Sequence, residues 1–320
     1  MSQPTLSLII PVLNEEENLP VLIKRLQNIA SELANEALEF LFVDDGSCDN
    51  SLGILKAFSE SDSRVRALGL SRNFGSHHAC LAGVQYAQGE RMVIMAADLQ
   101  DPPELVPQLL RAQTSKIEVV WGIRRQREES RQILFFANLY HQIMKSLVSR
   151  NWPGEGADVV LLTRKVRDML LDWPEKNTSL FAQIFWLGLP QSHVFYVKGK
   201  RHAGQSKWNF SKRLKLGLDS VISFSFLPIR LISYAGILIS VTGFLYALLI
   251  VFLRVFQITQ VPGWSSLMIV FLLTSGFQLM MLGVIGEYLW RSADQVKGRP
   301  FYVIREQIGY PVNDPAPFRS

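Results

Sequence analysis

The N-terminal part of the chain alternates between short runs of apolar side chains and longer stretches with apolar residues at helical spacing. We predict strands in the short runs and helices in the longer stretches. The predicted strands are Leu6–Val12, Phe40–Asp44, Val65–Leu70, Met92–Ala97 and Val119–Trp121. The predicted helices lie near Leu19–Ala34, Ser51–Ser59, Ser76–Ala87 and Pro103–Ala112. This alternation predicts an α/β domain with a mostly parallel sheet that helices cover on both faces.

Two longer apolar stretches follow, at residues 231–253 and 264–286, and neither contains a charged residue. As a helix, each is long enough to cross a hydrocarbon core about 30 Å thick. Buried core helices are the alternative interpretation, but helices of soluble proteins rarely lack charge over such a length. We therefore predict two transmembrane helices.

Basic residues flank the two predicted spans, whereas the hairpin between them carries only Arg254. The flanking residues are Lys207, Lys212, Arg213, Lys215, Arg230, Arg291, Lys297, Arg299 and Arg305. By the positive-inside rule, both ends of the chain are cytoplasmic. No signal peptide opens the sequence, so we expect a multi-pass protein of the inner (cytoplasmic) membrane with its N-terminal domain in the cytoplasm.

Two amphipathic stretches, residues 132–148 and 210–225, are predicted to lie on the membrane surface. For the first, packing on the soluble domain is nearly as good an interpretation. The resulting organisation is a soluble domain at 1–226, a membrane part at 227–290 and a cytoplasmic tail at 291–320.

The composition, 48% hydrophobic and 19% charged, suits a folded protein with an added apolar portion. The net charge is only +5, and the basic residues cluster beside apolar stretches. This distribution favours an anionic membrane surface over nucleic acid as a partner. Cys48 and Cys80 form no CxxC pair, so we expect a reducing compartment and neither a disulfide framework nor a zinc site.

Polar segments fall where the predicted strands end, which is the ligand-binding edge of a parallel sheet. These segments are Asn14-Glu15-Glu16, Asp44-Asp45-Gly46-Ser47, Arg72-Asn73-Phe74-Gly75 and Asp98-Leu99-Gln100-Asp101. The sequence contains neither GxGxxG nor GxxxxGK[ST], which argues against a dinucleotide enzyme and a P-loop nucleotidase.

Two of these segments carry candidate ligands. Asp44 and Asp45 can accept hydrogen bonds from a ribose or a base, although either one alone can equally cap a helix or close a turn. Asp98, Gln100 and Asp101 offer hard oxygen ligands that suit Mg²⁺ or Mn²⁺ on a diphosphate. Asp101 is also placed to cap the helix that begins at the following prolines.

Together, PVLNEEENLP, FVDDGS, SRNFG, AADLQDPPE and KGKRHAGQSKW resemble the inverting family-two glycosyltransferases of the GT-A fold. Within that family, the chain looks most like the branch of dolichol-phosphate mannose synthases and bactoprenol glucosyltransferases. The resemblance covers essentially the whole chain, including the two C-terminal spans. It implies a Rossmann-like GT-A domain that transfers a sugar, with glucose from UDP-glucose expected, to polyprenyl phosphate.

The resemblance also implies roles for single residues. Those implied to bind the donor are Pro11, Glu15, Asp45, Arg201 and Lys207. Asp98 and Gln100 would hold the metal, although relatives place a further carboxylate where this chain has Ala96. Asp101 or a water would then substitute. Ser206 lies in the same basic loop as Lys207, which would close over the donor diphosphate and the acceptor phosphate.

Arginines gather between the last predicted strand and the first amphipathic stretch, namely Arg124, Arg125, Arg127 and Arg131. Guanidinium groups bind phosphate bidentately, so this cluster suits capture of the lipid phosphate, with a solvated charged loop as the alternative. Asp158 matches the acidic position that the family places near the acceptor, and is predicted to be catalytic. We expect it to orient groups or tune charge, because a phosphate monoester is already a nucleophilic anion at neutral pH.

Two other functions fit parts of the sequence. A processive polysaccharide synthase would share the fold, but its QxxRW segment is missing from this sequence. A catalytically inert partner that binds or flips a lipid carrier would fit the loss of a carboxylate at Ala96, whereas Asp98, Gln100, Arg201 and Lys207 favour an enzyme. Two helices per subunit also suit packing against another copy, so a homo-oligomer is left open.

Overall fold

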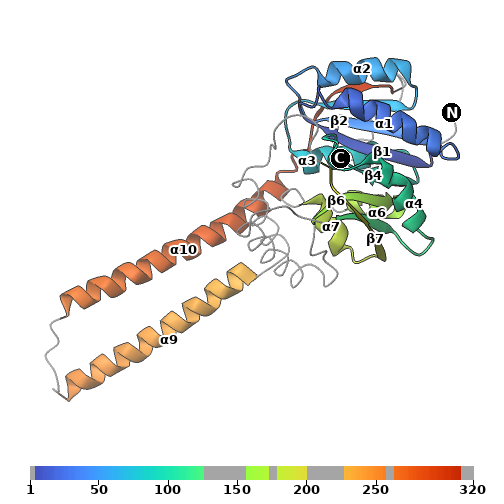
Figure 1. Ribbon diagram of the computed structural model, residues 1–320. Helices are drawn as coiled ribbons and strands as arrows, with labels where there is room; N and C mark the ends of the chain where they lie inside the picture. The colour runs from blue at the N-terminus through green and yellow to red at the C-terminus, as the bar shows by residue number, and fades with distance from the viewer. Residues whose placement is uncertain (1–3, 126–155, 173–178, 200–226, 257–262, 311–320) are drawn as a thin grey trace. The chain divides into compact units, whose positions relative to one another are not determined.

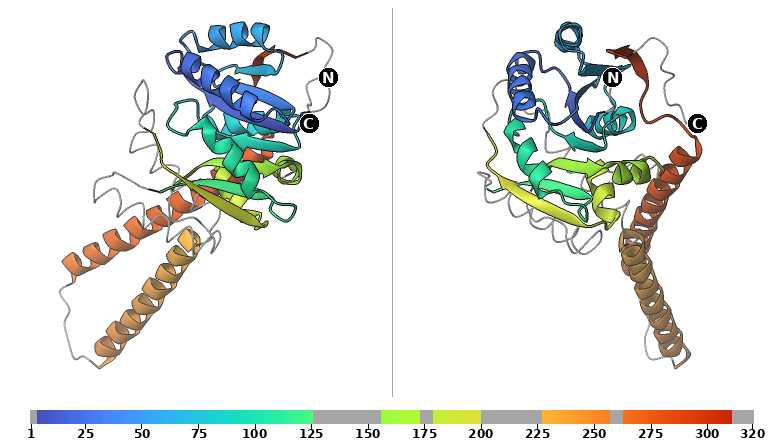
Figure 2. Two further views of the ribbon diagram at one scale, coloured as in Figure 1. Left: turned by 45° about the vertical axis from the view of Figure 1, so that its right-hand side comes forward. Right: turned by 90° about the vertical axis from the view of Figure 1, so that its right-hand side faces the viewer.

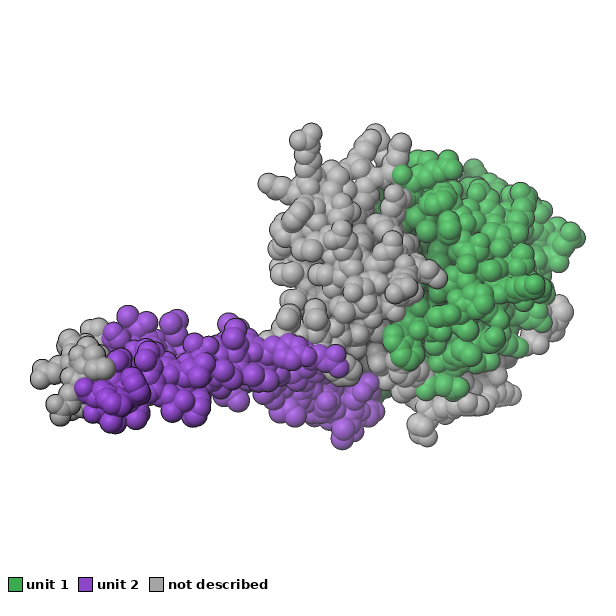
Figure 3. All heavy atoms as spheres, turned by 90° about the horizontal axis from the view of Figure 1, so that it is seen from below, with its two compact units in different colours: residues 1–220, 300–320 green, residues 221–299 purple. Residues whose placement is uncertain are grey.

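The structure is a computed structural model, and it describes residues 4–125, 156–172, 179–199, 227–256 and 263–310. The chain divides into two units (Figure 3): residues 1–220 with 300–320 form unit 1, and residues 221–299 form unit 2. Both predicted surface-lying helices, at 132–148 and 210–225, lie outside the described residues.

A single mixed sheet organises the described part of unit 1 (Figure 1), in the order β7-β5-β6-β4-β1-β2-β3-β8. The strands are β1 Leu6–Val12, β2 Leu38–Asp44, β3 Val65–Leu70, β4 Arg91–Ile94, β5 Val119–Arg124, β6 Ala157–Thr163, β7 Gln191–Tyr196 and β8 Ile304–Ile308. β6 and β8 run antiparallel to their neighbours, and the other pairs are parallel. Six strands therefore end at one edge of the sheet, where β6 and β8 begin.

Helices cover both faces of this sheet (Figure 2). One face carries α1 Leu19–Glu32, α2 Ser51–Ser61 and the η1 turn Pro103–Leu105 with α4 Val106–Ala112. The other face carries α3 Ser76–Tyr86, α6 Arg164–Asp172 and α7 Leu180–Trp186.

Strand β1 shows why both faces are covered. Successive side chains of a strand point to opposite faces. Leu8 and Ile10 belong to the same buried cluster as Leu22 of α1, whereas Ile9 between them lies against Gly83 of α3. Each of these aliphatic side chains is fully buried, which contributes roughly 1.5–3 kcal/mol per side chain. The apolar run at residues 8–12 of β1 is therefore what a strand between two helical layers requires.

The predicted α/β fold class, with a mostly parallel sheet, is confirmed. β1 and β3 have the predicted bounds, and β5 continues past Trp121 to Arg124. Five elements were not predicted from the sequence: β6, β7, β8, α6 and α7. Residues 300–310 belong to unit 1, where β8 pairs antiparallel with β3, so the sheet includes part of the segment that was expected to be a tail.

Unit 2 contains the two apolar helices, α9 Leu227–Val255 and α10 Trp264–Val296. Both extend beyond the predicted spans. Each holds a stretch that is long and apolar enough to cross a membrane, and neither stretch is buried. Large side chains such as Phe244 and Leu273 are 65% and 70% exposed, and a surface of this kind requires cover by lipid or by another protein.

Candidate active site

The loops that follow β1 and β2 are joined by hydrogen bonds from backbone to side chain. Asn14, with a φ of 48°, donates its N–H to the Ser47 hydroxyl oxygen at 2.8 Å, and its side-chain oxygen accepts the Cys48 N–H at 2.8 Å. The Glu15 N–H donates to the Ser51 hydroxyl oxygen at 2.8 Å. These contacts fix Glu15 beside the loop that follows β2 and the start of α2. Pro11, which has no N–H, lies beyond the last residue of β1 that pairs with β4.

Asp44 is the last residue of β2 and Asp45 the first after it, and the two carboxylates have different partners. Asp44 is fully buried and accepts the Ser47 N–H at 3.2 Å, so it closes the turn. Asp45 accepts the N–H groups of Phe74 and Gly75 at 2.7 and 2.9 Å. Burial raises the pKa of the Asp45 carboxyl above its usual value, against the lowering effect of these two hydrogen bonds. Asp45 therefore holds the loop after β3 in place, and its contact with uridine stays a prediction.

Gly46 permits the close packing of these two loops. It has a φ of +72°, and a Cβ at this position would lie 2.5 Å from the Arg72 carbonyl carbon, which belongs to the backbone. We expect Gly46→Ala to lower the unfolding temperature and to weaken nucleotide binding. Gly188→Ala is the matched control, because Gly188 has a φ of +64° but its Cβ would meet nothing closer than 3.8 Å.

Both alanines carry the left-handed strain of about 1–2 kcal/mol, so the difference between the two variants isolates the clash. The effect of the clash is measured by thermal unfolding and by UDP binding of the two variants, purified in detergent. Equal behaviour of the two variants would contradict the packing argument.

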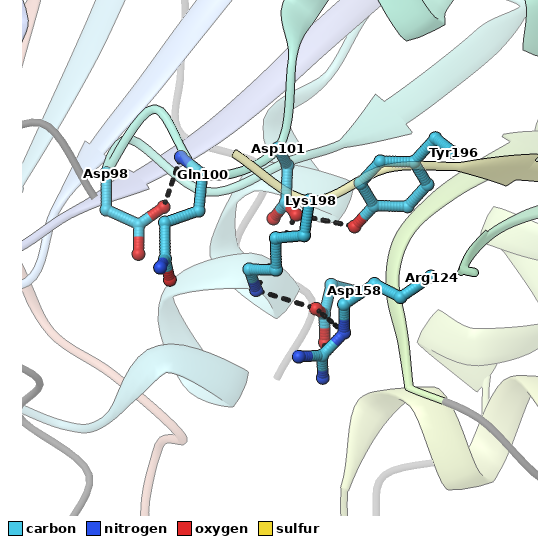
Figure 4. Close-up of polar contacts among 7 residues, drawn as sticks. All are labelled: Asp98, Gln100, Asp101, Arg124, Asp158, Tyr196 and Lys198. Carbon is cyan, nitrogen blue, oxygen red and sulfur yellow. Dashed lines mark hydrogen bonds and ion pairs between the residues drawn. The ribbon is translucent and has the colours of Figure 1, made fainter. Parts of the chain in front are cut away.

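Asp98 and Gln100 lie on one turn at the same edge (Figure 4), and Leu99 between them has a φ of 60°. The Gln100 N–H donates to Asp98 Oδ1 at 3.2 Å. Among the described residues, no group of three or more His, Cys, Asp or Glu side chains is placed to hold a metal ion. The turn offers one carboxylate, from Asp98, and one amide oxygen, from Gln100. This pair suits a hard cation such as Mg²⁺, which would take its remaining ligands from a diphosphate and water.

Asp101 has other partners and does not act as a helix cap. It is buried, accepts the Tyr196 hydroxyl hydrogen at 2.5 Å, and lies 3.6 Å from the Lys198 ammonium nitrogen. The N-cap of η1 is Pro102, without a side-chain hydrogen bond. Burial, assisted by the nearby Asp158 carboxylate, raises the pKa of Asp101 to about 6, and Lys198 acts against this shift. This carboxylate therefore faces a cation and a phenol, which argues against its replacing the carboxylate missing at Ala96.

Two cations converge on Asp158 at the start of β6. Arg124, at the end of β5, places its Nε 2.8 Å from Asp158 Oδ2, and Lys198 places its Nζ 2.8 Å from the same oxygen (Figure 4). Gly156 leaves room for this arrangement, because a Cβ there would lie 2.2 Å from an Arg124 guanidinium nitrogen. All three charged side chains are partly exposed. Arg124 and Lys198 thus meet at the Asp158 carboxylate in an accessible position, and Lys198 also lies 3.6 Å from Asp101. Two cations held side by side in this way can bind an added anion.

Of the predicted arginine cluster, the structure describes Arg124 and Arg125, and these two side chains have different partners. Arg125 places its guanidinium carbon 5.8 Å from the centre of the Phe195 ring, a cation–π contact, whereas Arg124 binds Asp158. The remaining predicted phosphate-binding residues lie outside the described residues, namely Arg127, Arg131, Arg201, Ser206 and Lys207.

Sequence reasoning missed Tyr196 and Lys198. Two signals were present: the segment KGKRHAGQSKW begins at Lys198, and residues 196 and 198 are two apart, which puts them on one face of an extended chain. Neither residue forms a motif by itself, and only the neighbouring strands give them a role.

Known proteins resemble this chain over nearly its full length. The profile described as Glycosyl transferase family 2 matches residues 7–176. Over 307 residues the chain is 39% identical to the uncharacterized glycosyltransferase YkcC of Bacillus subtilis, covering 95% of this chain and 94% of that protein. It is 34% identical, also over 307 residues, to the SfII prophage-derived bactoprenol glucosyl transferase of Shigella flexneri, covering 94% and 97%.

Among solved structures, the chain matches a glucosyl-3-phosphoglycerate synthase from Mycobacterium tuberculosis in complex with Mn²⁺, UDP and phosphoglyceric acid. The TM-score is 0.45 at 16% identity, and the match covers 67% of this chain and 75% of that chain.

Proposed function

This chain belongs to glycosyl transferase family 2 and is a glycosyltransferase, and on that premise we propose that it transfers glucose from UDP-glucose to polyprenyl phosphate. The acceptor class is supported by the bactoprenol glucosyl transferase of Shigella flexneri, which aligns over 94% of this chain, including part of the apolar region. The structural observation that carries the proposal is the pairing of Arg124 and Lys198 with one carboxylate, at the edge that also holds the Asp98 turn.

The need for these cations follows from the charges of the reactants. A polyprenyl phosphate and a sugar diphosphate are both anions, so they repel each other as they approach. Arg124 and Lys198 offset that repulsion, and Asp158 holds both cations in place before the acceptor arrives. Asp158 therefore acts by orienting the two cations, and the acceptor phosphate requires no base to remove a proton.

In the proposed reaction, a phosphate oxygen of the lipid forms a bond to the anomeric carbon of glucose. The bond from that carbon to the diphosphate oxygen breaks, and UDP leaves with the electron pair. Attack from the face opposite the leaving group inverts the anomeric carbon, so an α-linked donor gives a β-linked lipid product. A divalent cation, Mg²⁺ or Mn²⁺, held by Asp98 and Gln100 would supply positive charge next to the leaving diphosphate.

The proposal is tested by measuring UDP release from UDP-glucose by the full-length protein in detergent, with and without polyprenyl phosphate. Release that depends on the lipid, with one glucose per lipid in the product, supports it. Longer glycans on the lipid would favour a processive synthase. An absence of lipid-dependent release from UDP-, GDP- and dTDP-sugars would favour a binding or flipping partner and overturn the proposal.

We further propose that α9 and α10 cross the cytoplasmic membrane with the catalytic domain in the cytoplasm. The support is the clustering of basic residues outside the hairpin at 257–263. A single cysteine introduced into this hairpin, with Cys48 and Cys80 replaced, should react with an impermeant thiol reagent added to intact spheroplasts. A cysteine at the exposed Glu60 serves as the matched cytoplasmic control and should react only after lysis. Hairpin labelling that also requires lysis would refute this orientation.

A further inference from the structure

The described C-terminal segment, residues 300–310, belongs to the sheet unit although it follows both apolar helices in the chain. It lies outside residues 7–176, which the family profile matches. Its strand β8 covers the edge of the sheet at β3, with Leu68 opposite Gln307 and Leu70 opposite Ile304. The register shifts between Gly69 and Leu70, so the pairing becomes irregular just where β3 leads into the loop Arg72-Asn73-Phe74-Gly75, hereafter the RNFG loop.

The segment holds the chain immediately before the RNFG loop. β3 ends at Leu70, and the Ser71 N–H donates to the Val303 carbonyl oxygen at 2.8 Å. This bond continues the contact between the two strands past the register shift. The position at which the loop leaves the sheet is therefore set by a residue more than 200 positions later in the sequence.

The same segment also contacts the helix immediately after the RNFG loop. The centres of the Phe301 and His78 rings are 6.2 Å apart. His78 Nδ1–H donates to the Phe74 carbonyl oxygen at 2.9 Å. The neighbouring Tyr302 donates its hydroxyl hydrogen to Gln85 Oε1 on α3 at 2.5 Å. Phe301, Tyr302 and Val303 thus contact both sides of a four-residue loop.

The inner side of this loop supports Asp45. The Phe74 and Gly75 N–H groups are its hydrogen-bond donors, and Asp45 is only 3% exposed. A buried carboxylate that loses such donors is strongly destabilised, so a displaced loop forces Asp45 to move as well. The C-terminal segment is therefore connected to Asp45, a predicted donor-binding residue, by contacts through the RNFG loop.

We propose that Phe301, Tyr302 and Val303 are positioning residues of the donor site, which clamp the RNFG loop so that Asp45 and the adjoining loop after β2 are held ready for the nucleotide. This inference rests on the proposed function, since it assigns the loop to nucleotide binding. It extends the donor site to a part of the chain that none of the sequence motifs includes.

Two variants of the full-length protein test the clamp. Phe301→Ala removes the ring from His78, and Tyr302→Phe removes the bond to Gln85. Glu306→Gln is the matched control, because Glu306 lies in the same C-terminal segment but pairs with Lys56, and both side chains are substantially exposed. Phe301→Leu, which keeps an apolar side chain of similar reach, should retain most of the function.

The readouts are UDP affinity with MnCl₂, the KM for each substrate, and hydrogen exchange at the Phe74 and Gly75 amides. We expect Phe301→Ala to weaken UDP binding about tenfold, equivalent to about 1.4 kcal/mol, and to speed exchange at the two amides. The KM for polyprenyl phosphate should stay within about twofold, because the acceptor cations bind a different carboxylate.

The outcomes separate this inference from the proposed function. Normal UDP binding by the wild type and unchanged binding by Phe301→Ala and Tyr302→Phe would overturn the clamp alone. Faster exchange without a change in UDP affinity would also overturn it, because the segment would then be merely structural. A wild type that binds neither UDP nor GDP would overturn the proposed function, and the clamp's role in donor binding with it.

Discussion

Replacing Asp98 by asparagine is expected to lower kcat by roughly 10²–10³-fold, the range seen when one preorganised electrostatic group is lost from an active site. The expectation follows from the turn at the end of β4, where Asp98 and Gln100 are the only hard oxygen ligands that we assign to the cation. Ala96 supplies no carboxylate, so Asp98 has no acidic substitute at that position. UDP release from UDP-glucose at saturating polyprenyl phosphate, titrated with MnCl₂, measures the effect.

Asp168→Asn is the matched control for this experiment, because it makes the same change on a 61% exposed side chain of α6. Asp101→Asn is informative for another reason. Asp101 contacts Tyr196 and Lys198, so its loss should leave the dependence on metal concentration unchanged. Full activity of Asp98→Asn, or of the wild type in excess chelator, would show that the reaction does not use a metal held by Asp98.

The part of the fold that could be predicted consists of elements whose signal is local. The runs LSLIIPV in β1 and LEFLFVD in β2 are buried along nearly their whole length, so composition alone marks them as strands. β7 and β8 have the sequences QSHVFY and IREQI, in which polar residues interrupt the apolar ones. Both are the outermost strands of the sheet in the described part of the chain and are only partly buried, and an edge strand needs no continuous apolar run.

The candidate site divides in the same way. Asp45 and Asp98 could be found from the sequence because Asp45 follows β2 directly, Asp98 comes shortly after β4, and strand ends meet at one edge of a parallel sheet. Lys198 could not, because its partner Asp158 is 40 positions away and belongs to a strand that was not predicted. Tyr196 and Asp101 are separated by 95 positions. Contacts between residues so far apart in the chain depend on the order of strands in the sheet. A local sequence pattern does not reveal that order.

Replacing Lys198 therefore tests a site residue that only the structure reveals. Lys198→Met keeps most of the apolar length of the side chain and removes its charge. We expect kcat/KM for polyprenyl phosphate to fall about 10²-fold, which corresponds to about 2.7 kcal/mol of lost transition-state stabilisation. The physical reason is that one of the two cations that offset the repulsion between the anionic reactants is gone.

Donor affinity separates this role from general damage to the site. Lys198 pairs with Asp158 and Asp101, not with Asp45, so UDP affinity should change by less than about threefold. Lys56→Met is the matched control, because Lys56 of α2 also forms an ion pair, but its partner Glu306 lies on β8, at the opposite edge of the sheet from β7. It should leave both substrates unaffected.

Gly156→Ala provides a second, independent test, because it moves a cation without removing one. The added Cβ would lie 2.2 Å from the Arg124 guanidinium, and a long side chain can shift without disrupting the fold. We expect the KM for polyprenyl phosphate to rise while thermal stability stays close to that of the wild type. If Lys198→Met and Gly156→Ala both keep wild-type acceptor kinetics, Arg124 and Lys198 serve only to neutralise Asp158. The acceptor phosphate must then bind to cations elsewhere in the chain.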